Sequence, residues 1–175
     1  MSLYIYNMKT PIGTLRLCAD EKFLCAVTYA GDAPPDGALP EQPVLRQAAE
    51  QLREYFAGDR KEFTVPLRLQ GTAFQCAVWQ QLQKIPYGET GNYGQIAAQL
   101  GKPGAARAVG NACNKNNFLI LIPCHRVCAA KNMGGFALDL KIKQYLLKLE
   151  KPVVMGFVED LVDCTKNSLK IFQKN

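Results

Sequence analysis

Residues 92–113 read NYGQIAAQLGKPGAARAVGNAC, and this stretch decides the fold class of the C-terminal half of the chain. We predict two short helices here, over 92–100 and 104–112, joined by the turn Gly101-Lys102-Pro103. Two short helices joined by a glycine-containing turn form the outline of a helix-turn-helix. The second helix is made almost wholly of Ala and Gly around one long cation, Arg107. Such a smooth helix suits close packing against a DNA groove or inside the protein, and the residues alone favour neither.

The N-terminal part of the chain has a different pattern. Residues 3–29 alternate apolar and polar side chains in short runs separated by turn residues, which predicts a small antiparallel sheet. A proline-rich loop follows over 31–43, and then an amphipathic helix over 44–57 that stops at Gly58. We therefore expect an α+β protein with two small domains.

The expected domains are an N-terminal domain over residues 1–69 and a mainly helical domain over 70–150. The first is expected to end in an extended segment over 63–69. The second is expected to add helices over 72–83, capped by Thr72, and over 140–149. Residues 151–175 form an extension for which we predict packing or a partner contact and no chemical role.

Residues 122–127, IPCHRV, contain the only histidine of the chain, directly after a cysteine. A cysteine is a strong nucleophile only as its thiolate, which a neighbouring base makes accessible near neutral pH. The apolar run 118–122 predicts a buried strand that delivers Cys124 to a pocket. The alternative is a structural cysteine beside a surface histidine.

Composition limits the class of protein. The seven cysteines include no CxxC pair, and with a single histidine they do not fit a zinc site, so we expect mostly buried thiols. No run of about 18 apolar residues and no signal pattern occurs, so we expect a soluble intracellular protein without a membrane partner. Residues 69–150 hold nine Lys and Arg against three Asp and Glu, a charge that favours a polyanion such as nucleic acid.

Seven motifs of the chain occur in the order found in one known family. They are Gly71-Thr72-x-Phe74-Gln75, Val78-Trp79, Ile85-Pro86-Tyr87-Gly88-Glu89-Thr90, Tyr93-Gly94-Gln95-Ile96-Ala97, Arg107-Ala108-Val109-Gly110-x-Ala112, Ile122-Pro123-Cys124-His125-Arg126-Val127 and Gly134-Gly135-Phe136. Together they resemble the O6-alkylguanine-DNA alkyltransferases, also called methylated-DNA–protein-cysteine methyltransferases. The resemblance is dense over 71–150, and residues 1–70 fit the family's weakly patterned N-terminal domain. It implies an RNase H-like N-terminal domain and a winged-helix-like DNA-binding domain that carries the active cysteine.

The resemblance also implies an activity, DNA repair by direct reversal. Cys124 would accept the alkyl group of O6-alkylguanine, and of O4-alkylthymine, in a flipped-out base. His125 would take the thiol proton through a bridging water, and Glu150 would orient the imidazole. Tyr93 would contact the base and its phosphate and donate a proton, while Asn116 would brace the turn before the cysteine. Each molecule would act once, because the thioether formed has no leaving group that water readily displaces.

Further contacts follow from the same resemblance. The base pocket would be lined by Trp79, Phe136, Val127 through its carbonyl and Ala137 through its N–H toward O6. The contacts to DNA would come from Tyr93, Ala105, Ala106, Arg107, Gly110 and Arg126, with Arg107 filling the space left by the extruded base. We expect a monomer that binds double-stranded DNA with little sequence preference, uses no cofactor or metal, and works in the cytoplasm of a bacterium or archaeon or in a eukaryotic nucleus.

The chain departs from the family pattern at several positions, most at residues 136–139, where Phe-Ala-Leu-Asp replaces a common Tyr-x-Gly-Gly stretch. Asn92, Asn117 and Leu119 are smaller departures. Three other functions compete with alkyl transfer. One is an alkyltransferase-like protein that only marks the lesion and lacks the acceptor cysteine, which is present here. The others are a redox sensor built on Cys124 and Cys128, and a cysteine hydrolase.

Overall fold

The computed structural model describes residues 2–129 and 132–151, so the predicted extension over 151–175 lies outside the described residues except for its first residue. Contacts divide the chain into two units. The N-terminal unit contains residues up to 70 together with 117–121, and the C-terminal unit contains residues 71–116 and those from 122 onward. None of the described helices is long and apolar enough to cross a membrane.

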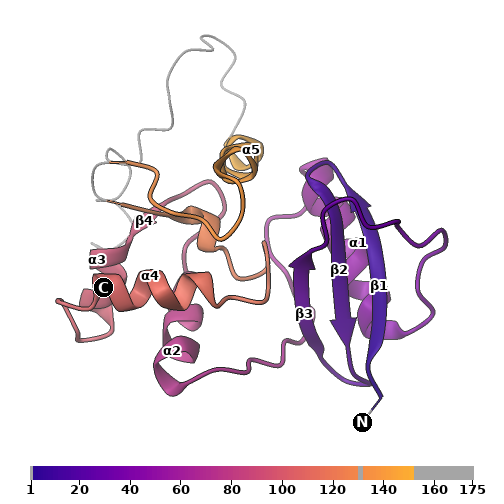
Figure 1. The fold of residues 1–175 in the computed structure, drawn as a ribbon, viewed down its shortest axis with the longest axis horizontal. Helices are drawn as coiled ribbons and strands as arrows, with labels where there is room; N and C mark the ends of the chain where they lie inside the picture. Colours follow the sequence, from indigo (N-terminus) through magenta and orange to yellow (C-terminus); the bar gives the residue numbers. More distant parts are fainter. Residues whose placement is uncertain (1, 130–131, 152–175) are drawn as a thin grey trace. The chain divides into compact units, whose positions relative to one another are not determined.

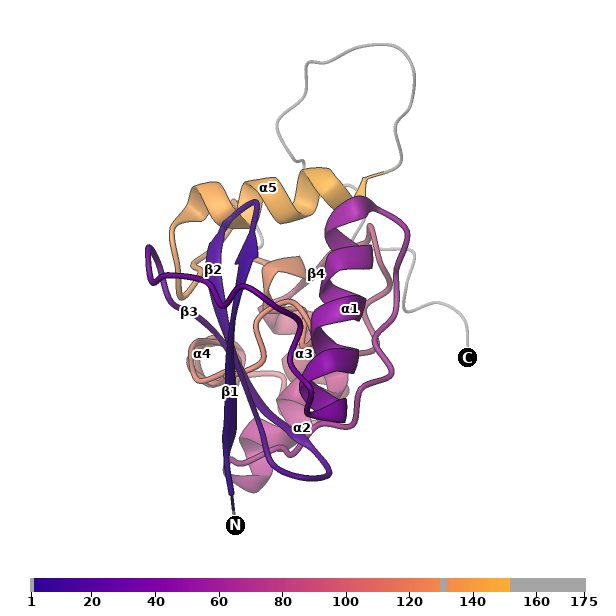
Figure 2. The ribbon, with the colours of Figure 1, turned by 90° about the vertical axis from the view of Figure 1, so that its right-hand side faces the viewer.

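The N-terminal unit is a three-stranded antiparallel sheet covered by one helix, as predicted (Figure 1). The strands β1 (Tyr4–Thr10), β2 (Gly13–Ala19) and β3 (Leu24–Tyr29) pair in chain order. The helix α1 (Pro43–Ala57) lies along one face of the sheet (Figure 2). The core forms where the fully buried face of β2 meets that of α1. Its members include Leu15, Leu17, Ala19, Leu45, Ala49 and Leu52.

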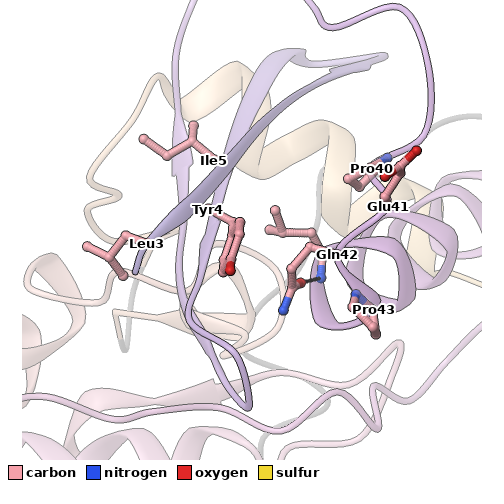
Figure 3. A pocket seen from close by; sticks show the side chains of 8 residues that line it. Leu3, Tyr4, Ile5, Pro40, Glu41, Gln42 and Pro43 are labelled. Carbon is pink, nitrogen blue, oxygen red and sulfur yellow. Dashed lines mark hydrogen bonds between the residues drawn. The ribbon is translucent and has the colours of Figure 1, made fainter. Parts of the chain in front are cut away.

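A shallow pocket lies in this unit, between the start of β1 and the beginning of α1 (Figure 3). It is lined by Leu3, Tyr4, Ile5, Pro40, Glu41, Gln42, Pro43 and Leu45. All the candidate functional residues belong to the other unit. The pocket thus belongs to the N-terminal unit and the predicted chemistry to the C-terminal unit.

The C-terminal unit begins with three short helices, α2 (Ala73–Leu82), α3 (Tyr93–Gln99) and α4 (Ala106–Asn114), which pack on one another. Thr72 and Asn92 cap α2 and α3. Each accepts the N–H of the residue three positions on, and the glutamine side chain at that position reaches back to the cap. The helices α3 and α4 form the predicted helix-turn-helix, and α5 (Leu140–Glu150) follows later in the chain.

The apolar run before Cys124 does not form the predicted strand. Phe118 makes a single bridge to Val27 of β3, and the chain then turns through Ile120, whose φ of 74° is left-handed. The segment 118–128 is buried throughout, so it lacks the alternation that distinguishes a strand from a buried turn. Residues Cys124–Arg126 form a single 3₁₀ turn, η1.

After that turn the chain becomes a very short strand. The strand β5 (Val127–Cys128) pairs in parallel with β4 (Gly91–Asn92), which directly precedes α3. The pairing fixes the segment after Cys124 beside the start of the helix-turn-helix. Local structure therefore brings Cys124 and Tyr93 into the same part of the unit.

Candidate active site

The thiol of Cys124 is buried, and a side-chain amide holds it. Its residue is 6% exposed, at the beginning of η1. The Nδ2 atom of Asn116 lies 3.3 Å from Sγ of Cys124 and donates to the carbonyl of Ile122 over 2.9 Å. Asn116 follows α4 by two residues, so its side chain joins the end of the helix-turn-helix to the cysteine.

Burial decides the protonation state of this thiol. Loss of water raises the pKa of Cys124 above its usual value, and the hydrogen bond from Asn116 and the positive charge of Lys143 oppose that rise. The net pKa shift is upward, so Cys124 is a protonated thiol at neutral pH. Formation of the thiolate therefore needs a base that takes the proton during the reaction.

His125, Glu150 and Arg126 form a buried charge cluster beside the cysteine. Nε2 of His125 lies 2.6 Å from Oε1 of Glu150. The guanidinium of Arg126 spans both carboxylate oxygens, with Nε at 2.8 Å from Oε2 and Nη2 at 3.1 Å from Oε1. The side chains of His125 and Glu150 are wholly buried. Glu150 lies 25 positions after His125 in the sequence, and the contact of α5 with η1 brings the two side chains together.

The cluster fixes the tautomer of the histidine. Burial alone would raise the pKa of Glu150, but its bonds to His125 and the charge of Arg126 hold that pKa well below its usual range. An ionised carboxylate only accepts hydrogen bonds, so Nε2 of His125 must carry the proton. Burial lowers the pKa of His125, and Glu150 opposes this only in part. The imidazole is therefore neutral, with its lone pair on Nδ1.

That Nδ1 atom is buried and has no hydrogen-bond partner among the described residues. A buried polar atom of this kind usually bonds to protein or ordered water. His125 therefore offers a basic nitrogen, one residue from a buried thiol, that a water molecule can reach by hydrogen bonding. This is the group that the chemistry of Cys124 requires.

Tyr93 lies at the first position of α3 and is partly exposed. Its phenol donates to the carbonyl of Gly135 over 3.3 Å. Burial, followed by the neighbouring thiols of Cys113, Cys128 and Cys124, raises the pKa of Tyr93 to about 12. The phenol therefore stays protonated, and it is a hydrogen-bond donor across the physiological range.

The segment 132–139 directly precedes α5 and contacts Tyr93 at Gly135. Phe136 is half-buried and Ala137 is exposed. Gly134 has a left-handed φ of 68°, and an added Cβ would lie 2.8 Å from the backbone nitrogen of Ala129. Only glycine fits the bend that brings this segment back toward β5.

Two predicted contacts disagree with the structure. Arg126 was expected to bind DNA, but it is 6% exposed, and it bonds to Glu150 and, through Nη1, to the carbonyl of Ile85 at 2.7 Å. Trp79 was expected to line the base pocket, but it is 2% exposed, and its Nε1 donates to the carbonyl of Ala112 at 2.9 Å. Arg126 is an internal partner of Glu150, and Trp79 of α2 bonds to α4.

The helix α4 presents a smooth outer face with one long side chain. Arg107, Ala108 and Asn111 are exposed, whereas Val109, Ala112 and Cys113 are buried against the rest of the unit. Ala105 and Ala106 are half-buried at the beginning of the helix, and Gly110 lies under the ring of Tyr93. Ala105 lies at the N-cap position of α4, and its methyl group makes no capping hydrogen bond to the helix.

The sequence reasoning missed one buried cation. Lys143 of α5 is completely buried, and its Nζ donates to backbone carbonyls. The signal was present in the sequence, because 143, 146, 147 and 150 share one face of a helix, and this face is buried. Within the described residues, no group of three or more His, Cys, Asp or Glu side chains is placed to hold a metal ion.

Two family models match almost the whole described chain. The model of the 6-O-methylguanine DNA methyltransferase ribonuclease-like domain matches residues 3–69, and that of its DNA binding domain matches 73–152. A methylated-DNA–protein-cysteine methyltransferase of Methanosarcina acetivorans is 44% identical over 153 residues, which cover 85% of this chain and 98% of that protein. The protein of the same name from Mycobacterium leprae is also 44% identical, over 87% of this chain and 95% of its own length.

Solved structures agree with these matches. The crystal structure of the O6-methylguanine methyltransferase of Mycobacterium tuberculosis has a TM-score of 0.76 and 40% identity, covering 86% of this chain and 93% of that one. A crystal structure described as that protein in complex with DNA has a TM-score of 0.76 and 42% identity, over 84% of this chain and 92% of that one. With a mixed α+β fold, both family domains in order and close relatives over nearly their full length, the chain belongs to the 6-O-methylguanine DNA methyltransferase family.

Proposed function

We propose that this protein repairs DNA by transferring the alkyl group of O6-alkylguanine, and of O4-alkylthymine, to Sγ of Cys124. The observation that carries the proposal is the buried thiol of Cys124 next to a neutral His125 whose basic Nδ1 has no partner among the described residues. The relatives named methylated-DNA–protein-cysteine methyltransferase support the same reaction. The protein is thus an enzyme by the reaction it performs.

The reaction starts with the proton of the thiol. In our proposal a bridging water passes this proton to Nδ1 of His125, while Glu150 accepts from Nε2 and keeps the ring in the required tautomer. The sulfur attacks the alkyl carbon in line with the bond to O6. The new S–C bond forms as the C–O6 bond breaks, and the bonding pair leaves on the guanine oxygen. Asn116, 3.3 Å from Sγ, stabilises the charge on sulfur before attack.

The departing base gains negative charge, so it needs hydrogen-bond donors. Tyr93 is the donor that we assign to it, because its phenol stays protonated. In the same proposal the N–H of Ala137 approaches O6, the Val127 carbonyl accepts from the exocyclic amine, and Phe136 lines the alkyl side of the pocket. The guanine anion then takes up a proton and returns to the duplex. The cysteine keeps the alkyl group, and each molecule acts once.

Access to a buried base requires that the nucleotide leave the stack, at a cost of a few kcal/mol. We assign the exposed Arg107 to the space that the base leaves, because it is the one long side chain on the smooth outer face of α4. Ala105, Ala106 and Gly110 let that helix approach the DNA backbone closely. Contacts to phosphates carry no sequence information, so binding should be salt-dependent and nearly independent of sequence.

Three further assignments belong to the same proposal. The chain acts as a monomer on double-stranded DNA, since one unit contains the thiol, its base and the helix-turn-helix. It works where the chromosome lies, which for the bacterial and archaeal relatives is the cytoplasm. We assign the alkyltransferase domain to residues 70–150, of which 117–121 belong by their contacts to the N-terminal unit, and the N-terminal domain to residues 1–69.

Mass spectrometry of the product tests the reaction. The protein is incubated with a duplex carrying one O6-methylguanine, and its peptides and the DNA are then analysed. We expect one methyl group on Cys124, unmodified guanine in the DNA and no second turnover. Cys124→Ala should bind the duplex with wild-type affinity and leave the lesion unrepaired. Tight binding by the wild type with an unmodified Cys124 would indicate a lesion-marking protein instead.

A further inference from the structure

Lys143 is a buried cation that the reaction described above does not use. It lies on α5 and is 0% exposed. Among the described residues, its Nζ donates to the backbone carbonyls of Val127 at 2.6 Å, Met133 at 2.5 Å and Gly135 at 3.2 Å. An ammonium group has three N–H donors and no acceptor, so backbone carbonyls are suitable partners for it. A charge is rarely buried without such compensation.

The three carbonyls come from two segments that must meet for the base pocket to form. Val127 starts β5, directly after the turn that contains Cys124. Met133 and Gly135 belong to the segment that continues to Phe136 and Ala137. Lys143 therefore joins the cysteine side of the site to the segment that we assign to O6 of the base.

The same segment is held from a second direction. The phenol of Tyr93 donates to the carbonyl of Gly135, which Lys143 also contacts. Gly134 lies against the backbone of Ala129, where a Cβ would be 2.8 Å from the nitrogen, and 3.1 Å from the Tyr93 ring. Lys143 and Tyr93 thus both bond to this segment, and the backbone of Ala129 limits its position at Gly134.

We propose that Lys143 is a positioning residue for alkyl transfer, whose ammonium holds residues 133–135 against the Cys124 segment so that the base pocket is preformed. This inference rests on the proposed function. A methionine at this position would fill a similar volume but donate no hydrogen bond. Met133 is half-buried and Gly135 is exposed, so their freed carbonyls could turn to water, and the segment would leave its path without unfolding of the unit.

The ammonium has a second effect on the same site. Its positive charge lowers the pKa of Cys124, against the larger effect of burial. Among the other titratable groups around the thiol, Cys113 and Tyr93 have pKa values raised to about 12, and His125 is neutral. At and above neutral pH, up to roughly pH 10, Cys113 and Tyr93 therefore stay protonated and His125 stays neutral. Loss of Lys143 should therefore raise the pH at which Cys124 ionises.

The test compares Lys143→Met with Lys141→Met, an exposed lysine on the same helix that removes the same charge. Three quantities are measured: the single-turnover rate of methyl transfer from an O6-methylguanine duplex at saturating protein, the dissociation constant for that duplex, and the pH midpoint of Cys124 alkylation by iodoacetamide. For Lys143→Met we expect a rate about 10- to 100-fold lower, because a small misplacement of reacting groups has that effect. The dissociation constant should stay at the wild-type value, because Lys143 is buried, and the midpoint should move upward. Lys141→Met should match the wild type in all three.

An equal transfer rate in Lys143→Met and Lys141→Met would overturn the proposal. If Lys143→Met does not fold, Gly134→Ala carries the test, because its Cβ displaces the same segment without removing a buried charge. A Gly134→Ala variant with the wild-type rate would then overturn it. A wild-type protein that leaves the lesion methylated would refute the proposed function instead. In that case the iodoacetamide midpoint still decides on Lys143, and an unshifted midpoint in Lys143→Met overturns the inference.

Discussion

Replacing Arg126 with methionine should destabilise the C-terminal unit and leave its phosphate contacts intact. The guanidinium makes two bonds to Glu150, at 2.8 and 3.1 Å, and one to the carbonyl of Ile85 at 2.7 Å. Removal of one partner from a buried ion pair costs about 3–5 kcal/mol, because the other charge stays buried. His125 remains as a partner of Glu150, so we expect a loss near the lower end, about 3 kcal/mol.

Urea unfolding followed by tryptophan fluorescence measures this loss. Trp79 is the only tryptophan of the chain, and on α2 it is buried and bonds to α4, so its signal reports the C-terminal unit. With a denaturant slope of about 2 kcal/mol per molar urea, a loss of 3 kcal/mol lowers the midpoint by about 1.5 M. The exposed Lys84 provides a matched control. Lys84→Met should change the stability by no more than about 0.5 kcal/mol.

The salt dependence of DNA binding tests the alternative, in which Arg126 contacts a DNA phosphate. A residue that neutralises one phosphate contributes about 0.9 to the slope of log K against log salt concentration. Because Arg126 is buried, its methionine variant should keep the wild-type slope. An unchanged urea midpoint together with a slope reduced by about 0.9 would refute the internal role of Arg126.

Two other perturbations follow from the same geometry. The pKa of Glu150 lies well below its usual range in the folded protein, so the carboxylate contributes stability above its unfolded pKa of about 4.3. This contribution is lost as the pH falls through the folded pKa. The urea midpoint reported by Trp79 should therefore drop steadily below about pH 4.5. An equally steep drop in a Glu150→Gln variant would show that Glu150 is not the cause. Arg107→Ala should slow methyl transfer from a duplex by about 10-fold or more, as filling the space of an extruded base offsets a few kcal/mol, yet spare the free modified base. Lys115→Ala, a nearby exposed control, should affect both substrates little, and equal losses on both substrates in Arg107→Ala would argue against the assignment.

Most helices and the N-terminal sheet could be predicted because their signals are local. Thr72 and Asn92 each cap the helix that follows, and Gly58 ends α1 in a left-handed conformation. The segment before Cys124 could not be predicted in this way. All of its side chains are buried, so their pattern has no period, and the left-handed turn at Ile120 depends on contacts with β3 from a distant part of the chain.

The residues of the site likewise divide into those with a local sequence signal and those placed by contacts between distant parts of the chain. Cys124 and His125 are adjacent in sequence, so a thiol beside a base could be proposed from the residues alone, with a structural cysteine as the alternative. Glu150 lies 25 positions from His125, and only the resemblance to a family connected the two. Arg126 and Lys143 were interpreted as surface charges or passed over, because a sequence does not state whether a cation faces water. In this unit both cations are buried and bond to acceptors inside the protein.

The opposing pKa shifts at Cys124 and His125 suit a cysteine that is used once. Burial raises the pKa of the thiol and lowers that of the imidazole, and both changes favour the neutral pair over a thiolate–imidazolium pair. Arg126 contributes to this, because its charge offsets that of Glu150, which would otherwise stabilise an imidazolium. A permanently ionised thiol would react with any electrophile that entered the site, and each such event would consume one molecule. Asn116 and Lys143 oppose the shift only in part, so the thiol of the free protein stays protonated at neutral pH.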